Sequence, residues 1–387
     1  MGKKQLVTNQ SPENLQITPI IEFQSKQLFA IKRILKKVGL GSAGLELLAQ
    51  NRTSSRSNRI VKRPALPLGW IIAKGARPRG FLGNVPVRMR LGDKGIVGAA
   101  MRAMGVEPGF TSSSFALLAR FLAQTQPKVF LNTSANRAIC PLLLQAGFKP
   151  IPQPYLNQSL FWILQARQLL LDYLRGVGLP SAFSKIIANL GAPLLKVETV
   201  MRQRKFHTAC RRAHIVKIKP ENLNQEFDRL WLEFAKKNPG KLLTDRSQGG
   251  LRWHFSEGNK TILHPHIFAY RSRGKLCGYL ATGVETSPRT GIRRCRVVDL
   301  VVPSGRKIVI RQLLQRAYTD AIQSGSHVFE LTGFSGVVRQ VALQANPYVK
   351  KYDYPRFWYA TGDPALDHRL RKARSWYTSP FDGDATL

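Results

Sequence analysis

The chain has 387 residues, of which 43% are hydrophobic and 21% are charged. A chain of this length predicts two or three domains with buried cores. The apolar content excludes a largely disordered protein, which would need low hydrophobicity together with high charge.

The charge is strongly unbalanced, because 60 Lys and Arg against 22 Asp and Glu give a formal net charge of +38. Such an excess attracts polyanions by non-specific electrostatics. Nucleic acid, anionic glycan, a phosphorylated cofactor and an anionic membrane surface all qualify. The basic residues are spread along the whole chain, so a solvated basic surface without a dedicated partner is an equal alternative.

The four cysteines form no C-x-x-C pair, which argues against a disulfide framework and for reduced thiols in the cytoplasm. They are Cys140, Cys210, Cys277 and Cys295. No apolar segment follows Lys3 and Lys4, and no apolar run reaches about 18 residues. We therefore expect a cytoplasmic protein with neither a secretory signal nor a transmembrane span.

The N-terminal part of the chain predicts a loose segment followed by a helix. Residues 1 to about 24 are polar and are expected to be loose. Apolar residues recur with helical spacing within 25–50, and Gly39 and Gly41 end the helix. Its other face is basic, which suits a membrane or a partner, but a helix that covers the core of the first domain is the favoured interpretation.

A basic linker at 51–66 precedes a region in which short strands alternate with helices. Strands and turns are predicted up to about residue 108. A helix at 112–124 is expected to bury one face, formed by Phe115, Leu118, Ala119 and Leu122. The further elements are a strand at 129–132, a helix at 136–146 that ends at Gly147, and a strand at 148–151.

The second half of the chain repeats this layout after two long apolar helices, near 158–175 and 180–200, that form a connector. Helices are predicted at 222–237 and 310–324, and strands at 266–270, 276–284, 294–302 and 328–331. The tail after Ala360 is polar. Alternating elements of this kind predict an α/β fold with helices covering mixed sheets.

The most informative segment runs from Val106 to Phe115, where a strand ends, a turn follows and a helix begins. Free backbone N–H groups and the helix dipole make such a start suitable for an anion, and a pyrophosphate would fit. A serine-rich N-cap without a ligand is the alternative. The hydroxyl side chains at the helix start are Thr111, Ser112, Ser113 and Ser114.

This segment resembles motif A of the GNAT acetyltransferases, V-x-P-x-x-R-G-x-G-x-x-x-x-L, which grips the pyrophosphate of acetyl-CoA. Val106 and Pro108 match, Thr111 replaces the arginine, and two serines replace the glycines. Residues 132–136 and 145–149 resemble the family's next block, so the resemblance covers roughly residues 65–155. It implies acetyl-CoA as the acyl donor, bound by Val106, Thr111, Ser112, Ser113, Ser114 and Asn136.

The sequence departs from the family pattern at the residues that carry proton transfer. The tyrosine that often serves the family as general acid is replaced by Leu143. Glu107 is the nearest carboxylate and the candidate general base, although its side chain could equally cap the helix. Without the two glycines, the backbone approaches a phosphate less freely.

The second half resembles FemAB-type aminoacyl transferases and related polysaccharide-locus acyltransferases, through residues 297–300 and the helix and strand that follow. Asp299 lies in an apolar strand, where a raised pKa would suit a general base. A structural Asp with satisfied hydrogen bonds is the favoured alternative.

The resulting prediction is an α/β protein of two GNAT-like lobes, with mixed sheets flanked by helices. The expected divisions are a loose N-terminus at 1–24, a first lobe with the cofactor turn at 25–155, a helical connector at 156–205, and a second lobe with a polar tail at 206–387. His207, Cys210 and His214 do not predict a metal site, because no second ligand pair lies nearby and Arg211 and Arg212 would repel a cation.

The predicted function is acyl transfer from acetyl-CoA, or a similar acyl-CoA, to an amine acceptor. Family analogy suggests an amino sugar or a surface-polysaccharide precursor. The cofactor is expected in the first lobe, and the second lobe is expected to bind the acceptor. Two alternatives stay open: a basic nucleic-acid-binding protein on a decayed acyltransferase fold, and a tRNA-dependent aminoacyl transferase.

Overall fold

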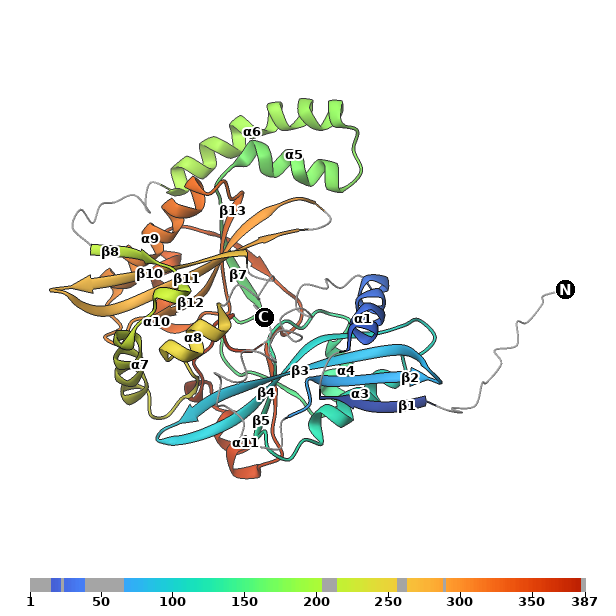
Figure 1. Ribbon diagram of the computed structural model, residues 1–387. Helices are drawn as coiled ribbons and strands as arrows, with labels where there is room; N and C mark the ends of the chain where they lie inside the picture. The colour runs from blue at the N-terminus through green and yellow to red at the C-terminus, as the bar shows by residue number, and fades with distance from the viewer. Residues whose placement is uncertain are drawn as a thin grey trace.

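The computed structural model describes residues 15–21, 24–38, 66–203, 214–255, 263–287 and 290–383. Two mixed sheets, each flanked by helices, lie side by side (Figure 1). We call the first sheet with its helices the first lobe and the second sheet with its helices the second lobe. The α/β fold class predicted from the sequence is confirmed.

The strand order of the first sheet is β1-β2-β3-β4-β5-β15-β6, and β9 pairs with β3 beside this path. The strands are β1 (Leu15–Ile20), β2 (Gly69–Lys74), β3 (Arg77–Leu91), β4 (Lys94–Val106), β5 (Val129–Asn132), β15 (Trp358–Ala360), β6 (Lys149–Pro150) and β9 (Leu242–Thr244). The helices of this lobe are α1 (Ser25–Lys37), α3 (Ser113–Leu122), α4 (Cys140–Gln145) and α11 (Pro364–Leu370).

The strand order of the second sheet is β14-β7-β13-β12-β11-β10-β8. The strands are β14 (Tyr348–Lys351), β7 (Gln158–Ile163), β13 (Val328–Thr332), β12 (Arg293–Val301), β11 (Lys275–Thr286), β10 (Leu263–Ser272) and β8 (His214–Ile218). The other helices are α5 (Ala166–Gly176), α6 (Ser181–Gln203), α7 (Gln225–Lys237), α8 (Gln248–His254), α9 (Lys307–Gln323) and α10 (Gly336–Leu343), with short 3₁₀ turns at Pro220–Asn222 and Ala373–Ser375.

The two lobes repeat one topology. In the first lobe β2, β3 and β4 are antiparallel, α3 follows β4, and β5 pairs with β4 in parallel. In the second lobe β10, β11 and β12 are antiparallel, α9 follows β12, and β13 pairs with β12 in parallel. The similarity of the two halves that the sequence predicted is therefore present in three dimensions.

Each sheet also contains a strand from the other half of the chain. β7 follows β6 in sequence but lies between β13 and β14 in the second sheet. β15 follows β14 in sequence but lies between β5 and β6 in the first sheet. This exchange of strands ties the two lobes together through two crossing segments, residues 151–157 and 352–357.

The helix predicted at 25–50 is present as α1, and it covers the core, which was the favoured interpretation. Ile31, Ile34 and Leu35 are fully buried, and two of them join a cluster with β3 and β4 side chains such as Phe81 and Ala100. Gly39, Gly41 and residues 51–65 of the linker predicted at 51–66 lie outside the described residues. The helix at 222–237 is likewise present as α7, capped by Asn224, whose side chain accepts from the Glu226 N–H.

Several elements differ from the prediction. Residues 15–20, expected to be loose, form β1 and pair with β2. Residues 158–163, expected to begin a helix, form β7, because they pair on both edges with strands from the other end of the chain. The tail after Ala360 is not simply polar, since Trp376 and Phe381 are buried within it.

The helix predicted at 112–124 is present as α3, but of the four residues expected on its buried face only Leu118 is buried. Phe115 is exposed, whereas Leu117, Leu118 and Phe121 are fully buried against the sheet. Among the described residues, the structure contains no helix long and apolar enough to cross a membrane.

Candidate functional site

The parallel pairing of β4 and β5 is short. It joins Gly98–Ala100 to Val129–Leu131, although β4 continues to Val106. A β-bulge interrupts β4 in this unpaired part, where Ala103 has a φ of 50°. Bulges of this kind bend a strand and redirect its backbone groups. We call the point where the two strands part, beyond Ala100 and Leu131, the first fork.

A buried acceptor without a partner lies at the first fork. Phe130 of β5 packs with Leu117 and Phe121 of α3, and Asn132, two residues on, lies on the same side of the sheet because side chains alternate along a strand. Asn132 is 3% exposed, and its Oδ1 has no hydrogen-bond partner within the described residues. A buried polar atom left in this state costs about 1–3 kcal/mol, so an N–H from a ligand would stabilise it.

The turn between β4 and α3 presents only part of the predicted anion site. Thr111 and Ser112 are exposed, and no described group accepts a hydrogen bond from either backbone N–H. The N–H groups of Ser113 and Ser114 donate to Phe110 O at 2.9 Å and to Thr111 O at 3.0 Å. Both serine side chains are buried. Thr111 and Ser112 are therefore the members of the predicted set that can donate to a ligand.

Glu107 holds this turn in place, and its carboxylate is not free because two basic side chains bind it. Its oxygens accept from Arg79 Nη1 at 2.8 Å and from Lys37 Nζ at 2.9 Å. Hydrogen bonds from Arg79 and Lys37 lower the pKa of Glu107 from 4.5 to about 2. A general base works best with a pKa near the working pH. The geometry thus argues against Glu107 as the base and for a role in clamping β3, α1 and the turn together.

The remaining first-lobe residues of the prediction make contacts within the protein. Asn136 accepts from the Ile139 N–H through its side chain at 3.2 Å and so caps the turn before α4. Leu143 is fully buried in the cluster that α3 and α4 share. Val106, the last residue of β4, is half-buried next to Gly80. The structure brings Val106, Thr111 and Ser112 together at one end of α3, but places Asn136 on the other side of β5, at the start of α4.

The second lobe contains an equivalent fork that the chain itself fills. β12 and β13 pair over Arg294–Val297 and Val328–Leu331 only, and a bulge follows in β12. The C-terminal segment, residues 376–383, lies there. Tyr377 Oη donates to Leu300 O, and Phe381 N donates to Val298 O at 3.1 Å.

A second contact fixes the same segment on the β13 side, where Thr378 Oγ1 donates to Gly333 O at 2.9 Å. The segment therefore bridges β12 and the residues that follow β13. It ends at Gly383, which packs against Thr133, the residue after β5 in the first lobe. The C-terminal segment thus occupies the second fork and reaches the edge of the first.

Asp299 belongs to a buried ionic cluster between the lobes. Arg246, which follows β9, donates to Asp299 from Nε at 2.9 Å and from Nη2 at 3.2 Å. It also donates to both carboxylate oxygens of Asp382 at 2.9 Å. Tyr279 and Ser379 complete the bonds to Asp299, at 2.6 Å and 2.9 Å. This arrangement fits the structural alternative for Asp299, since every oxygen is in use and the group is fully buried.

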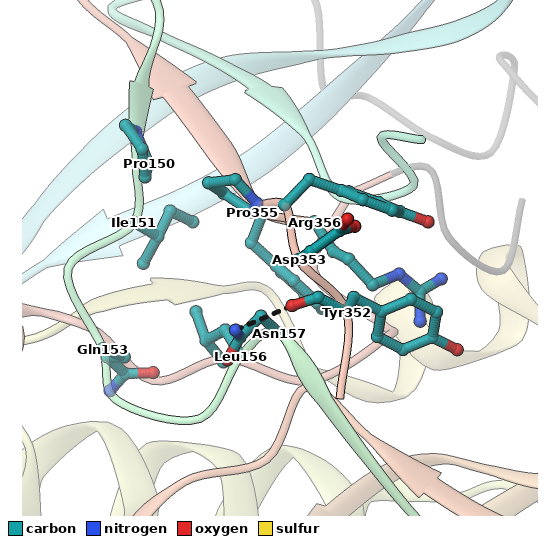
Figure 2. Close-up of a pocket in the computed structure, with 11 residues that line it drawn as sticks. Pro150, Ile151, Gln153, Leu156, Asn157, Tyr352, Asp353, Pro355 and Arg356 are labelled. Carbon is teal, nitrogen blue, oxygen red and sulfur yellow. Dashed lines mark hydrogen bonds between the residues drawn. The ribbon is translucent and has the colours of Figure 1, made fainter. Parts of the chain in front are cut away.

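A separate hollow of about 320 Å³ lies between the two crossing segments (Figure 2). Ile151 and Leu156 line it from one segment, and Tyr352 and Phe357 from the other. Asn157 Nδ2 donates to Tyr352 O at 3.0 Å and joins the two segments. The hollow lies at the ends of β6 and β15, on the far side of β5 from β4, and so is distinct from the first fork.

The second lobe contains the same motif pattern, again without its two glycines. The pattern V-x-P-x-x-R-G-x-G-x-x-x-x-L that was matched at Val106 also fits at β12 and α9, with agreement at Val301, Pro303, Arg306 and Leu314. The backbone N–H groups of Lys307 and Ile308 have no acceptor in the described part of the chain. In the sequence Val301 and Pro303 already match, but residues 304–310 lack the Gly-x-Gly spacing, and the cofactor was therefore expected in the first lobe.

Among the described residues, no group of three or more His, Cys, Asp or Glu side chains could hold a metal ion. His207 and Cys210 lie outside those residues.

No family model matches the sequence, and no curated protein matches it. The structure is similar to that of a GCN5-related N-acetyltransferase from Anabaena variabilis ATCC 29413, with a TM-score of 0.52 and 13% identity over 90% of this chain and 73% of that chain. It is also similar to N-myristoyltransferase from Saccharomyces cerevisiae with bound myristoyl-CoA, with a TM-score of 0.51 and 12% identity over 92% of this chain and 84% of that chain. These similarities confirm the GNAT-like fold.

Proposed function

We propose that the protein is an N-acyltransferase that uses an acyl-CoA donor held at the first fork. The difference between the two forks carries this proposal. The second is occupied by the C-terminal segment, whereas the backbone of β4 beyond Ala100 has no hydrogen bond to another described backbone group on the side of β5. The structurally similar proteins are an N-acetyltransferase and an N-myristoyltransferase that binds myristoyl-CoA, which supports this class of reaction.

The start of α3 supplies the groups that suit a pyrophosphate. The N–H groups of Thr111 and Ser112 donate to no acceptor among the residues that the structure describes, and the dipole of α3 favours negative charge at this end. Lys37 and Arg79 share the single carboxylate of Glu107, so this cluster keeps a net positive charge. An anion bound at the turn would therefore meet both hydrogen-bond donors and favourable electrostatics.

The residues of the first fork also suit the amide chain of a coenzyme A. Asn132 Oδ1 is a buried acceptor in need of a donor, and a pantetheine amide carries such an N–H. The coenzyme would supply an acyl group activated as a thioester. The protein would hold the amine acceptor close to that group and exclude water from it, which lowers the entropic part of the barrier.

The acceptor we propose is an amine, and we keep the amino sugar or polysaccharide precursor as the first candidate on the ground of the family resemblance. Acetyl-CoA is the first donor to test. The base that removes the proton from the amine is a group other than Glu107, whose carboxylate is committed to two cations.

Calorimetry with acetyl-CoA tests the donor site through a matched pair of variants. Ser112→Glu places a carboxylate at the start of α3, and Ser304→Glu places one at the equivalent turn before α9; both serines are exposed. Like charges about 4 Å apart repel by about 1 kcal/mol in water and about 4 kcal/mol near a protein surface, so Ser112→Glu should weaken binding roughly 10-fold or more. Ser304→Glu should bind as the wild type does.

Two outcomes would contradict the proposal. If the wild type takes up no acetyl-CoA, longer acyl-CoA or free CoA at millimolar concentration, the donor class is wrong. If Ser304→Glu loses binding and Ser112→Glu retains it, the donor site belongs to the second lobe.

A further inference from the structure

The helical hairpin of α5 and α6 projects from the second lobe, at the top of Figure 1. The inner face of α6 packs on α5 through small side chains. Ser184 and Ala188 are fully buried, and a Cβ at Gly191 would lie 3.4 Å from Leu170 of α5. The two helices contact each other through this face, and the opposite face of α6 does not take part in the contact.

That outer face is apolar and exposed. Leu190 is 73% exposed and Phe183 is 61% exposed. With a rotation of about 100° per residue, the exposed apolar positions fall within an arc of roughly 120° on the side away from α5. They are Phe183, Ile186, Ile187, Leu190 and Val197. We call these five residues the outer stripe.

No other described helix or strand carries as many exposed large apolar side chains as α6. Seven of the nineteen large apolar side chains that are exposed lie on this hairpin, because Tyr173 of α5 and Val177 at its C-terminal end are exposed as well as the five residues of the stripe. Single exposed apolar residues are ordinary on protein surfaces, but a contiguous patch marks an interaction site.

Basic side chains border the outer stripe along one edge. Lys185 and Lys196 are exposed there, about one turn before and two turns after Asn189. Arg167 of α5 donates to the Asn189 side chain at 2.8 Å. One carboxylate, Glu198, lies beyond the opposite edge of the stripe. The chain as a whole carries a formal charge of +38.

We propose that the hairpin docks on an anionic lipid bilayer, with the outer stripe among the acyl chains and the basic edge at the headgroups. An apolar face beside lysine and arginine is the arrangement of helices that lie in the membrane interface. The helices do not span the membrane, because none is long and apolar enough. Such docking would hold the catalytic lobes at a membrane surface, which goes beyond the proposed acyl transfer and does not depend on it.

Charge favours this occupant over the two others that an apolar basic surface suggests. A nucleic acid needs cations and stacking rings, and it gains little from aliphatic residues such as Ile186, Ile187 and Leu190. A second copy of the chain would bring two strongly basic molecules together, and their repulsion opposes association. Anionic lipids complement both the charge and the apolar stripe.

Vesicle flotation tests the proposal on the full chain. Wild-type protein should float with vesicles of phosphatidylcholine and phosphatidylglycerol at 7:3, and much less with pure phosphatidylcholine. The double variant Ile186→Gln/Leu190→Gln should bind the anionic vesicles roughly 10-fold or more weakly, because each substitution removes an apolar side chain from the buried face. Leu232→Gln, at a similarly exposed leucine on α7, should bind as the wild type does.

A second variant separates the two parts of the interaction. Lys185→Gln/Lys196→Gln should weaken binding to the anionic vesicles and leave the weak binding to pure phosphatidylcholine unchanged. All the substituted side chains are exposed, so equal thermal unfolding midpoints would show that the fold is intact.

Three results would overturn the proposal. The first is a wild type that does not float with anionic vesicles. The second is binding that Ile186→Gln/Leu190→Gln leaves unchanged, which would assign it to the general positive charge. The third is a wild-type dimer in light scattering that this variant converts to a monomer, which would assign the stripe to a second copy of the chain.

Discussion

Replacing Asp299 by asparagine tests whether the buried cluster is structural. The substitution keeps the shape of the side chain but removes its charge and one of its two acceptor oxygens. Arg246 would then be balanced by Asp382 alone. Because Asp299 lies at the filled second fork, we expect a loss of stability rather than a specific loss of chemistry.

The size of the effect follows from the contacts. Asp299 accepts four hydrogen bonds, and Arg246 donates to both of its oxygens. Whichever way the new amide is turned, its NH₂ group meets the guanidinium and orphans a buried donor, which costs about 1–3 kcal/mol. Removing one partner of a buried ion pair costs about 3–5 kcal/mol. We take about 3–5 kcal/mol as the total, since both figures describe the same loss.

Thermal unfolding measures this change. At about 1.2 °C for each kcal/mol in a chain of 387 residues, the midpoint of Asp299→Asn should fall by roughly 4–6 °C. Glu226→Gln is the matched control, because Glu226 also pairs with an arginine, Arg271, but at a partly exposed position. Its cost should stay near or below about 1 kcal/mol. Equal midpoints for Asp299→Asn and the wild type would refute the reasoning, and a folded but inactive Asp299→Asn would return this residue to the catalytic candidates.

Two further predictions concern charge. The pKa of Glu107 is lowered from 4.5 to about 2 in the folded state, so its contribution to stability is complete above about pH 4.5 and is lost as the pH falls toward 2. The unfolding midpoint of Glu107→Gln should therefore depend less steeply on pH over that range than the midpoint of the wild type. An unchanged pH profile would contradict the ion pairs. If the +38 charge serves a polyanion, affinity for heparin or single-stranded RNA should fall linearly on a log–log salt plot, with a slope of about 0.7–0.9 for each phosphate contact. A flat profile would leave the charge as a solvated surface.

Local patterns in the sequence predicted the order of strands and helices well, because that order depends on neighbouring residues. The strand–turn–helix segment ending in α3 is one such case, since the change from strand to helical spacing is visible around Ser113. The face of α3 was harder to predict, because apolar residues occur on two sides of the helix. Its contact with the sheet selected Leu117 and Phe121 rather than Phe115.

The exchange of strands between the lobes could not be read from the sequence. Residues 158–163 are apolar and run into α5, so a helix and a buried strand fit them equally well. These residues form a strand because they pair with β13 and β14, which lie far along the chain. β15 is a similar case, because it is short and its partners β5 and β6 precede it by about 200 residues.

The candidate site was only partly predictable for the same reason. The position of the turn followed from its own residues, but the partners of Glu107 lie 28 and 70 residues away, and they change a candidate base into a clamp. The importance of Asn132 rests on the absence of a described partner for its buried oxygen. A sequence pattern gives neither of these facts.

The second lobe shows why the better match to a motif need not mark the functional site. Val301, Pro303 and Arg306 reproduce the helix start of the pattern, which depends on local geometry alone. Access to the fork behind that helix depends on residues 376–383, some 70 positions later, which satisfy the backbone of β12 through Tyr377 and Phe381. Where two strands part, the backbone N–H and C=O groups along the fork have no hydrogen-bond partner on the neighbouring strand. If these groups are buried, another segment or a ligand has to supply the donor or acceptor. In the second lobe the chain supplies that group. In the first lobe no described backbone group does so for β4 beyond Ala100. The buried oxygen of Asn132 adds to the same deficit, which is why we assign the ligand to the lobe with the weaker motif.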